Sequence, residues 1–372
     1  MARAKAPRGA TPGAPKPKPK PKPKRSKAMP PAPSAQQREL LQALLDHPGD
    51  KRARQIYGDL LEDAGDPRGE LINLQCARAD LPADDARLAE ILAREAELLK
   101  QHKKAWTTFG QAGAARYELR WGMVEKASLD AADLIACGAT LFAREPVEEL
   151  AIWKIAESAP SPAGSRLAPV LQPWLRSVRR LSLARSELTE QDVEALATAT
   201  CLANVEVLDL TSTAIGPSGA ELLARATSLP RLRELRVGTC FLEDDGLEAL
   251  ARSPTLRLER LLATRDDISP RGAQAIADAT WASDLVHLDL SSNELLGDDG
   301  LRALADAPRL TSLRSLVLEY VGLGDDAAAI VLGSAVCARL EHLDLSSNLS
   351  GADVDRIRAT FGDRLHMRHA RH

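Results

Sequence analysis

The chain has 372 residues, of which 44% are hydrophobic and only 3% aromatic, so it can bury a large core built mainly of aliphatic side chains. No stretch approaches the roughly 20 apolar residues that span a bilayer, and the N-terminus lacks the apolar run of a secretory signal. The composition therefore excludes a membrane-spanning protein and predicts an intracellular, cytoplasmic one. The five cysteines contain no C-x-x-C pair, which favours reduced, mostly buried thiols.

Residues 1–35 differ in charge from the rest of the chain. They contain ten Lys or Arg and no acidic residue, so the net charge of −3 leaves −13 on the remainder. Lys and Pro alternate from Pro15 to Lys24, which predicts a disordered, extended tail. The tail could be a solubilising segment, a spacer, or an arm that binds nucleic acid or another polyanion. The candidate polyanion-binding residues are Lys16, Lys18, Lys20, Lys22, Lys24, Arg25 and Lys27.

Residues 36–105 are predicted to form a small all-helical domain, because apolar residues recur at spacings of three and four. Asp66 before Pro67 is a typical helix start, since the carboxylate can cap free N–H groups where proline needs none. Gly65 is a plausible end for the preceding helix. A further helix is predicted from about Asp84 to Lys104.

The stretch from Gln55 to Gln75 contains a longer motif. Its characteristic residues are Tyr57, Asp59, Leu61, Glu62, Gly65, Asp66, Pro67, Arg68, Gly69, Glu70, Ile72, Leu74 and Gln75. In this pattern the segment resembles the bacterial repeat-companion domain. It departs from the family at Gly58, Leu60 and Leu71, and it has one residue fewer between Pro67 and Arg68. The resemblance implies a helical domain that precedes leucine-rich or other repeats, and it implies no activity.

Residues 106–146 are predicted to connect this domain to the repeats and to cap them, with a strand over Tyr117–Lys126 and a helix over Ala131–Ala143. Four of the five tryptophans lie between positions 106 and 174, namely Trp106, Trp121, Trp153 and Trp174. Large side chains at one end favour a cap for the first repeat, and the alternative is a ligand-stacking role.

From residue 147 to 372 the motif L-x-x-L-x-L recurs with a helix-like segment after it. The first strand leucine is found at Leu150, Leu181, Leu208, Leu235, Leu261, Leu288, Leu316 and Leu343, and after one longer step the spacing is 26 to 28 residues. These repeats resemble the ribonuclease-inhibitor-like leucine-rich repeats. The resemblance implies an α/β solenoid, with a curved parallel sheet inside and helices outside. A short strand within Phe361–Met367 is expected to close it.

The asparagine that usually follows the strand is present only as Asn293 and Asn348. Its replacements are Ser186, Thr213, Cys240, Asp266 and Val321. We therefore expect irregular inner turns.

Residues that alternate with the buried leucines are predicted to form the concave face of the solenoid. The predicted partner-binding residues on this face are Trp153, Arg236, Arg260, Leu262, Arg265, His287, Asp289, Glu319, Tyr320, His342 and Asp344. Arg and Tyr are favoured at interface hot spots. The alternative is a solvated surface with local ion pairs, such as one between Asp209 and Arg236.

No sequence motif indicates catalysis, because the chain has no phosphate-binding loop, no H-E-x-x-H pair and no G-x-S-x-G elbow. Paired carboxylates at Asp244–Asp245, Asp298–Asp299 and Asp325–Asp326 fall at helix starts, where the helix dipole favours negative charge. His287 and His342 lie two repeats apart, about 10 Å, which is too far to share a metal. His366, His369 and His372 are predicted to form a frayed end.

The sequence thus predicts a monomeric, non-enzymatic protein–protein interaction scaffold without metal or cofactor. One alternative is an adaptor that binds polyanions through the basic tail. Another is a regulator of a GTPase, by analogy with the similar repeats of Ran GTPase-activating protein.

Overall fold

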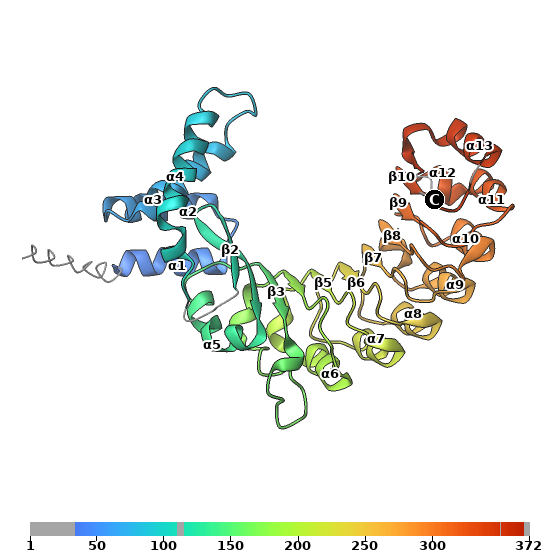
Figure 1. Cartoon of the computed structure of the whole chain (residues 1–372), viewed down its shortest axis with the longest axis horizontal. Helices are drawn as coiled ribbons and strands as arrows, with labels where there is room; N and C mark the ends of the chain where they lie inside the picture. Colours follow the sequence, from blue (N-terminus) through green and yellow to red (C-terminus); the bar gives the residue numbers. More distant parts are fainter. Residues whose placement is uncertain (1–33, 110–114, 350, 368–372) are drawn as a thin grey trace, which may run out of the picture.

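In the computed structural model, which describes residues 34–109, 115–349 and 351–367, the chain forms a curved α/β solenoid preceded by four helices (Figure 1). A single 11-stranded sheet runs in chain order from β1 to β11. The sheet lines the inside of the curve and the repeat helices lie outside it. The predicted fold class is confirmed. The basic tail, including Lys16 to Lys27, and residues His369 and His372 lie outside the described residues.

The helical region consists of α1 (Ala35–Asp46), α2 (Lys51–Asp63), α3 (Pro67–Ala79) and α4 (Leu88–Trp106). Polar residues cap the first three helices. Ser34 forms a capping box with Gln37, Asp50 accepts a hydrogen bond from the Ala53 N–H, and Asp66 accepts one from the Arg68 N–H. Gly65 has a positive φ of 76° at the end of α2. The helix boundaries predicted at Gly65 and Asp66 therefore agree with the structure.

The strand predicted over Tyr117–Lys126 is present but divided, because a turn at Trp121 and Gly122 makes this segment a hairpin. Strand β1 (Arg116–Arg120) pairs antiparallel with β2 (Met123–Asp130). Trp121 and Gly122, at φ values of 53° and 68°, make the reversal, as a tight hairpin turn requires. The helix predicted over Ala131–Ala143 is present as α5 (Ala131–Phe142).

The repeats pair each strand with an outer helical segment. The strands are β3 (Glu149–Trp153), β4 (Arg180–Ser182), β5 (Val207–Asp209), β6 (Glu234–Arg236), β7 (Arg260–Leu262), β8 (His287–Asp289), β9 (Ser315–Val317), β10 (His342–Asp344) and β11 (Leu365–His366). The helices are α6 (Glu190–Thr198), α7 (Gly216–Ala224), α8 (Glu243–Ala251), α9 (Pro270–Asp278), α10 (Gly297–Ala305), α11 (Ala327–Gly333), α12 (Ala335–Ala338) and α13 (Ala352–Phe361). Between β3 and β4 the outer segment contains only 3-10 turns, at Ile155–Glu157 and Pro173–Ser177. This is where the repeat spacing is longest.

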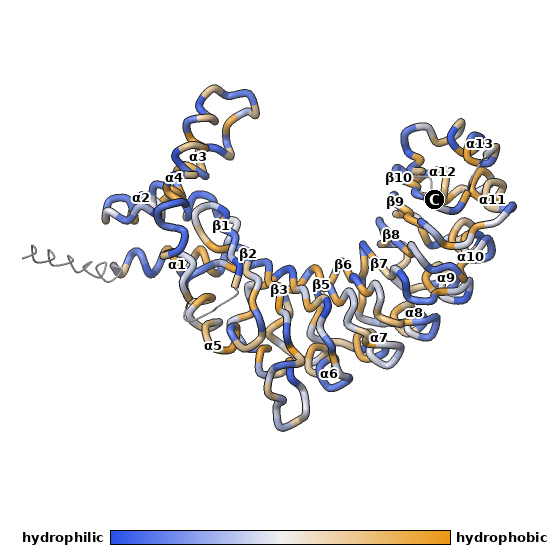
Figure 2. The backbone as a smooth tube through the Cα atoms, in the orientation of Figure 1, coloured by the Kyte–Doolittle hydropathy of each residue, from blue (hydrophilic) through white to orange (hydrophobic). Residues whose placement is uncertain are grey.

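The predicted strand leucines are directly in register from Leu150 to Leu343. Each is at most 2% exposed, and together with the inner faces of the helices they form one continuous core. Figure 2 shows hydrophobic segments along the row of strands and again in the outer helices. At the end of the chain, the expected closing strand is confined to β11, because α13 continues through Phe361 and a 3-10 turn follows it.

The inner turns are regular, so the expected irregularity was wrong. The Asn293 side chain accepts hydrogen bonds from the N–H groups of Asp266 (2.8 Å) and Ile268 (3.1 Å), and it donates to the carbonyls of Ala263 (2.9 Å) and Leu290 (2.7 Å). Asn348, which follows β10 as Asn293 follows β8, makes the same four hydrogen bonds.

Three of the five replacements for asparagine make part of the same pattern. Asp266 Oδ1 accepts a hydrogen bond from the Cys240 N–H (2.6 Å), and the Cys240 thiol and the Thr213 hydroxyl both donate to the Leu210 carbonyl, at 3.0 and 2.6 Å. Ser186 and Val321 depart from it, because the Ser186 hydroxyl has no hydrogen-bond partner within the described residues and valine has no polar side-chain atom. Their turns keep the positive φ of the other repeats, at Arg185 and Tyr320, so the backbone geometry does not depend on this side-chain bond.

Candidate functional site

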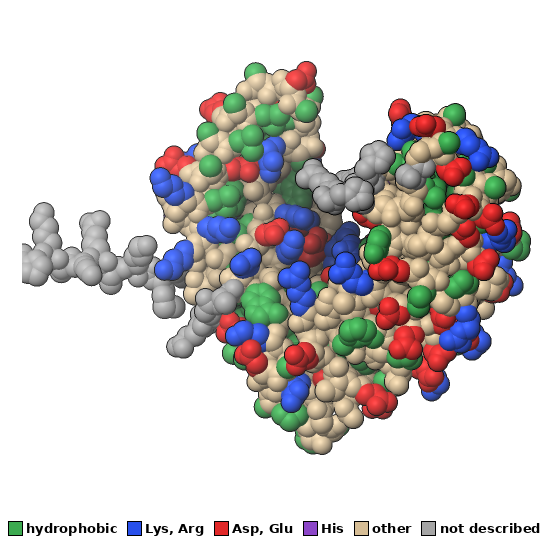
Figure 3. All heavy atoms as spheres, turned by 45° about the vertical axis from the view of Figure 1, so that its right-hand side comes forward, with side chains coloured by type: hydrophobic (Ala, Val, Ile, Leu, Met, Phe, Trp, Pro, Cys, Tyr) green, Lys and Arg blue, Asp and Glu red, His purple; other side chains and the backbone are tan. Residues whose placement is uncertain are grey.

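The predicted partner-binding residues occupy adjacent columns of the concave wall. Arg260, His287 and His342 lie in the column that begins each strand, and Arg236, Leu262, Asp289 and Asp344 lie in the central column. Trp153 and Glu319 belong to the next column, with Arg265 and Tyr320 one residue beyond it. Neighbouring strands are about 4.8 Å apart, so these side chains share one continuous surface. Figure 3 shows Lys and Arg side chains gathered in the hollow of the curve.

Arg236 and Arg260 are both held by one carboxylate, that of Glu234. Its side chain is 11% exposed, and its two oxygens lie 2.6 Å from Arg236 Nη2 and 3.1 Å from Arg260 Nε. The expected pair between Asp209 and Arg236 was wrong, because Glu234, two residues from Arg236 on the same strand, takes the guanidinium. The arrangement fixes two half-exposed guanidinium groups side by side on the concave surface.

Glu149 at the start of β3 makes a second cluster of this kind. Its carboxylate lies 3.3 Å from Arg120 Nη1 and 3.9 Å from both Lys126 Nζ and Arg180 Nε. Lys126 also pairs with Glu118 at 3.4 Å, so three cations share two carboxylates and the cluster keeps one excess positive charge. Sequence reasoning did not select Glu149 or Glu234, since a glutamate at a strand start does not reveal which cations surround it.

The aspartates of the central column stabilise the turn at the end of each strand. Oδ1 of Asp209 accepts a hydrogen bond from the Thr211 N–H (3.0 Å), and Asp289 and Asp344 accept one in the same way from the N–H groups of Ser291 and Ser346. This turn at the end of the strand is formed by aspartate or asparagine bonding the backbone two residues later. A D-x-[ST] spacing in the sequence is the signal that could have identified it.

The concave histidines lie in polar surroundings. His287 Nδ1 is 2.9 Å from the Ser315 hydroxyl, and burial together with the nearby Arg260 lowers the pKa of His287. The rings of His342 and His366 lie 5.6 Å apart between their centroids. His366 lies in β11 and pairs with Asp344 of β10, which corrects its prediction as part of a frayed end. Among the described residues, no group of three or more His, Cys, Asp or Glu is placed to hold a metal ion.

The four tryptophans expected to form a cap are spread over the N-terminal end. Trp174 packs on Phe142 at 4.9 Å between ring centroids, on the outer side, and Trp106 stacks on His102 at 5.3 Å. Trp121 packs into the core of the helical region. Trp153 alone of the four is placed on the concave strands, in register with Asp130.

Two of the paired carboxylates cap the following repeat. Asp244 accepts hydrogen bonds from the Ser269 N–H (2.9 Å), the Ser269 hydroxyl (2.5 Å) and the Gly272 N–H (2.9 Å), and Asp298 accepts them from Gly324 and Asp326. Burial alone would raise the pKa of Asp244, but the hydrogen bonds from Ser269 and Gly272 hold it below its ordinary value. These carboxylates thus join neighbouring repeats.

The motif that resembles the repeat-companion domain forms the contact between the helices and the hairpin. Arg68 donates to the Gly122 carbonyl (2.8 Å) and pairs with Glu145 at 2.6 Å, and the Gln75 side chain accepts a hydrogen bond from the Gly122 N–H (2.7 Å). Arg54, only 2% exposed, pairs with Glu125 at 2.8 Å. The motif residues Arg68 and Gln75 therefore hydrogen-bond to the turn of the hairpin that begins the sheet.

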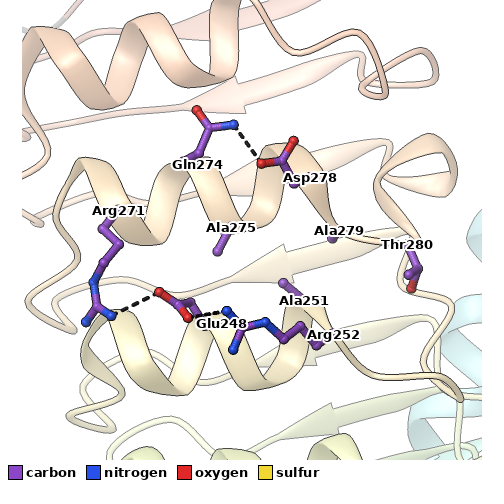
Figure 4. Close-up of a pocket in the computed structure, with 9 residues that line it drawn as sticks. All are labelled: Glu248, Ala251, Arg252, Arg271, Gln274, Ala275, Asp278, Ala279 and Thr280. Atoms are coloured by element: carbon purple, nitrogen blue, oxygen red, sulfur yellow. Dashed lines mark hydrogen bonds and ion pairs between the residues drawn. The ribbon is translucent and has the colours of Figure 1, made fainter.

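A pocket between α8 and α9 lies on the outer, helical side of the solenoid (Figure 4). Its charged residues bind one another, since Glu248 pairs with Arg271 (2.9 Å) and Arg252 (2.6 Å) and Gln274 donates to Asp278 (2.8 Å). The Glu248–Arg271 pair joins the two helices, whereas the other two contacts each lie along one helix. Because these charged groups bind one another, they do not converge on a ligand.

Comparison with protein families supports the architecture. The family model of the leucine-rich repeat matches residues 201–224 and 283–305. These two segments match leucine-rich repeats, in a chain that folds as an α/β solenoid. None of the curated proteins matches it. Among solved structures, a chain of the Rad7 and Elc1 complex in yeast is similar, at 15% sequence identity and a TM-score of 0.41, with 86% of this chain and 90% of that chain covered. Within the described ranges, no helix is long and apolar enough to cross a membrane.

Proposed function

We propose that the protein is a non-enzymatic scaffold that docks a protein partner on the concave face of its leucine-rich repeats. The observation that carries this proposal is the asymmetry of the solenoid: helices cover the outer face of the sheet, whereas the described residues leave β3–β10 uncovered on the inside. Half-exposed Arg236 and Arg260 and the exposed Tyr320 lie on or beside this face. Arginine and aromatic side chains of this kind anchor protein interfaces.

The concave face offers little for catalysis. The closest approach to a nucleophile–base pair is the His287–Ser315 hydrogen bond, and within the described residues no carboxylate hydrogen-bonds the other ring nitrogen of His287. A catalytic serine normally needs such an orienting group and a set of oxyanion donors.

We further propose that residues 36–105 are a repeat-companion domain with a mechanical role, that residues 106–146 complete the cap, and that residues 147–372 form the docking solenoid. The contacts of Arg68 and Gln75 with the Gly122 turn support this division, because these two characteristic residues of the motif contribute to the junction. Five free cysteines, four of them buried, suit a cytoplasmic protein.

Affinity capture from a native lysate tests the docking surface. The bait is the full chain, and the concave variant changes Arg236, Arg260 and Tyr320 to alanine. The matched control changes Arg225 and Arg252 on the outer helices and the exposed Ile135 on α5, so the charge and the apolar area removed are comparable. We expect a defined protein to be lost with the concave variant alone. Equal loss with both variants, or with neither, would place the interface elsewhere.

A further inference from the structure

Charge changes sign along the concave wall between β7 and β8. In the six residues that start at the beginning of each strand, β3–β7 carry six cations and three carboxylates. The cations are Lys154, Arg180, Arg185, Arg236, Arg260 and Arg265, and the carboxylates are Glu149, Asp209 and Glu234. The same positions on β8–β10 carry Asp289, Glu319 and Asp344 and no Lys or Arg. The N-terminal part of the wall therefore attracts anions and the C-terminal part repels them.

The basic part is organised around its two glutamates. Glu234 holds the guanidinium groups of Arg236 and Arg260, and Glu149 gathers Arg180 with Arg120 and Lys126. Glu118 pairs with Lys126 as well, so each cluster keeps one excess positive charge. The lysine and arginine side chains of both clusters remain between 41% and 57% exposed, and their ion pairs hold them in position. They can therefore bind incoming carboxylates with little further loss of side-chain entropy.

A nucleic acid fits this wall poorly. Asp209 lies between the two clusters, and Asp289, Glu319 and Asp344 follow directly, so a strand with a charge at every phosphate would meet repulsion along the wall. Single-stranded nucleic acid also needs aromatic side chains for base stacking, and Trp153 and Tyr320 are far apart, on β3 and just after β9. A protein segment can place acidic side chains at chosen positions and neutral ones between them.

We propose that the wall over β3–β7 binds an acidic protein segment, whose carboxylates pair with the arginines gathered by Glu149 and Glu234. This inference rests on the proposed docking function and adds the chemistry of the partner. The two clusters are three strands apart, about 14 Å, which an extended chain covers in about four residues. The segment should therefore carry acidic groups about four residues apart and run across the strands.

The test is fluorescence anisotropy of a labelled oligoglutamate peptide with the full chain. The concave variant combines Arg236→Gln with Arg260→Gln, and the control combines Arg225→Gln with Arg252→Gln on the outer helices, so both lose the same net charge. We expect the concave variant to bind about tenfold more weakly and the control to bind as the original chain does. A second variant, Arg185→Gln with Arg265→Gln, removes arginines that have no ion pair with any described residue, so it leaves the clusters intact, and we expect a smaller loss.

Three outcomes would overturn the proposal: no binding of the peptide, equal weakening in the concave and control variants, or tighter binding of an oligothymidylate of equal charge through the same arginines. Failure of the docking function is detected separately with Leu262→Ser and Tyr320→Ser, which change no charge. If lysate capture depends on Leu262 and Tyr320 while oligoglutamate does not bind, the acidic chemistry is wrong and docking stands. If capture is also unaffected, docking on this face is wrong as well.

Discussion

The repeats and the N-terminal end of the sheet hold their neighbouring elements together in different ways. Within the repeats, leucines in equivalent positions stack on one another, and side chains such as Asn293 bond the turns of adjacent repeats. At the N-terminal end, a small apolar cluster joins Ile72 and other helix residues to Met123 of the hairpin. Largely buried ion pairs add directional contacts to it, Arg54 with Glu125 on β2 and Arg68 with Glu145, which follows α5.

The difference follows from what each contact must specify. Apolar stacking works wherever a neighbour has the same shape, so the repeats need only a period and a leucine. A junction between unlike parts has no such period, and directional hydrogen bonds select one orientation, at the cost of removing charges from water. The repeats should therefore tolerate loss of a polar contact better than the junction does.

Breaking the junction should have the largest effect. Glu145→Ala removes the acceptor of the Val124 N–H and the carboxylate partner of Arg68, whose side chain is only 15% exposed and keeps just its hydrogen bond to the Gly122 carbonyl. We expect a loss of about 3–5 kcal/mol in the free energy of unfolding of the part that contains α2, α3 and the hairpin. Hydrogen exchange of the full chain measures this region directly. The control is Glu70→Ala, which breaks the more exposed pair with Arg94 and should cost at most about 1 kcal/mol. Similar effects of the two changes would show that burial of the pair is unimportant.

Leu288→Ala should have the next largest effect, within the repeats. Leu288 is completely buried between Leu261 and Leu316, so its truncation leaves a cavity and should cost about 2–5 kcal/mol. Leu295→Ala is the matched control, since Leu295 is 66% exposed and should change stability little. Urea unfolding of both variants gives the comparison. A loss confined to the hairpin and helices would contradict a repeat core that is continuous through β8.

Asp266→Asn should stabilise the protein, by an amount that depends on pH. Burial raises the pKa of Asp266 to about 7, and its Oδ2 has no hydrogen-bond partner within the described residues. Between the ordinary value of 3.8 and about 7, the folded state keeps a proton that the unfolded state has released, so stability decreases as pH rises through this window. Asparagine does not titrate, and it can donate to the carbonyls that correspond to those bound by Asn293.

The expected gain is about 1–2 kcal/mol above pH 7 and smaller near pH 5, measured by urea unfolding. Asn293→Asp is the reverse control, and above pH 7 we expect it to be less stable than the original chain. An equal gain for Asp266→Asn at both values would mean that ionisation of Asp266 has no part in it.

The smallest effect is expected from the surface pairs of the outer helices. Arg252→Ala removes an ion pair with Glu248 whose arginine side chain is 77% exposed. Water and salt screen such a pair, so stability should change by less than about 1 kcal/mol. Thermal unfolding in low and moderate salt measures it, and a large loss would show that the pocket between α8 and α9 supports the fold.

Features that follow from the repeat spacing of 26 to 28 residues were predicted correctly from the sequence. The register from Leu150 to Leu343, and hence the central concave column, follows from counting residues. Contacts between residues that no period relates could not be predicted in this way. The hydrogen bond from Arg68 to Gly122 joins residues 54 positions apart. The pair of Glu234 with Arg236 does follow from the two-residue period of a strand, but the sharing of Glu234 with Arg260 depends on how the two guanidinium groups turn toward it. The hairpin was missed because Trp121, which carries a positive φ, gives no turn signal beyond the glycine that follows it.

Hydroxyl-radical footprinting of the full chain, with and without the protein that it captures, tests the central claim most directly. Docking on the concave face predicts protection of Trp153, Tyr320 and His342, which lie on or beside the inner strands, with Ile135 on α5 and Leu92 on α4 unchanged. Protection of Ile135 or Leu92 while the concave residues react as before would contradict it.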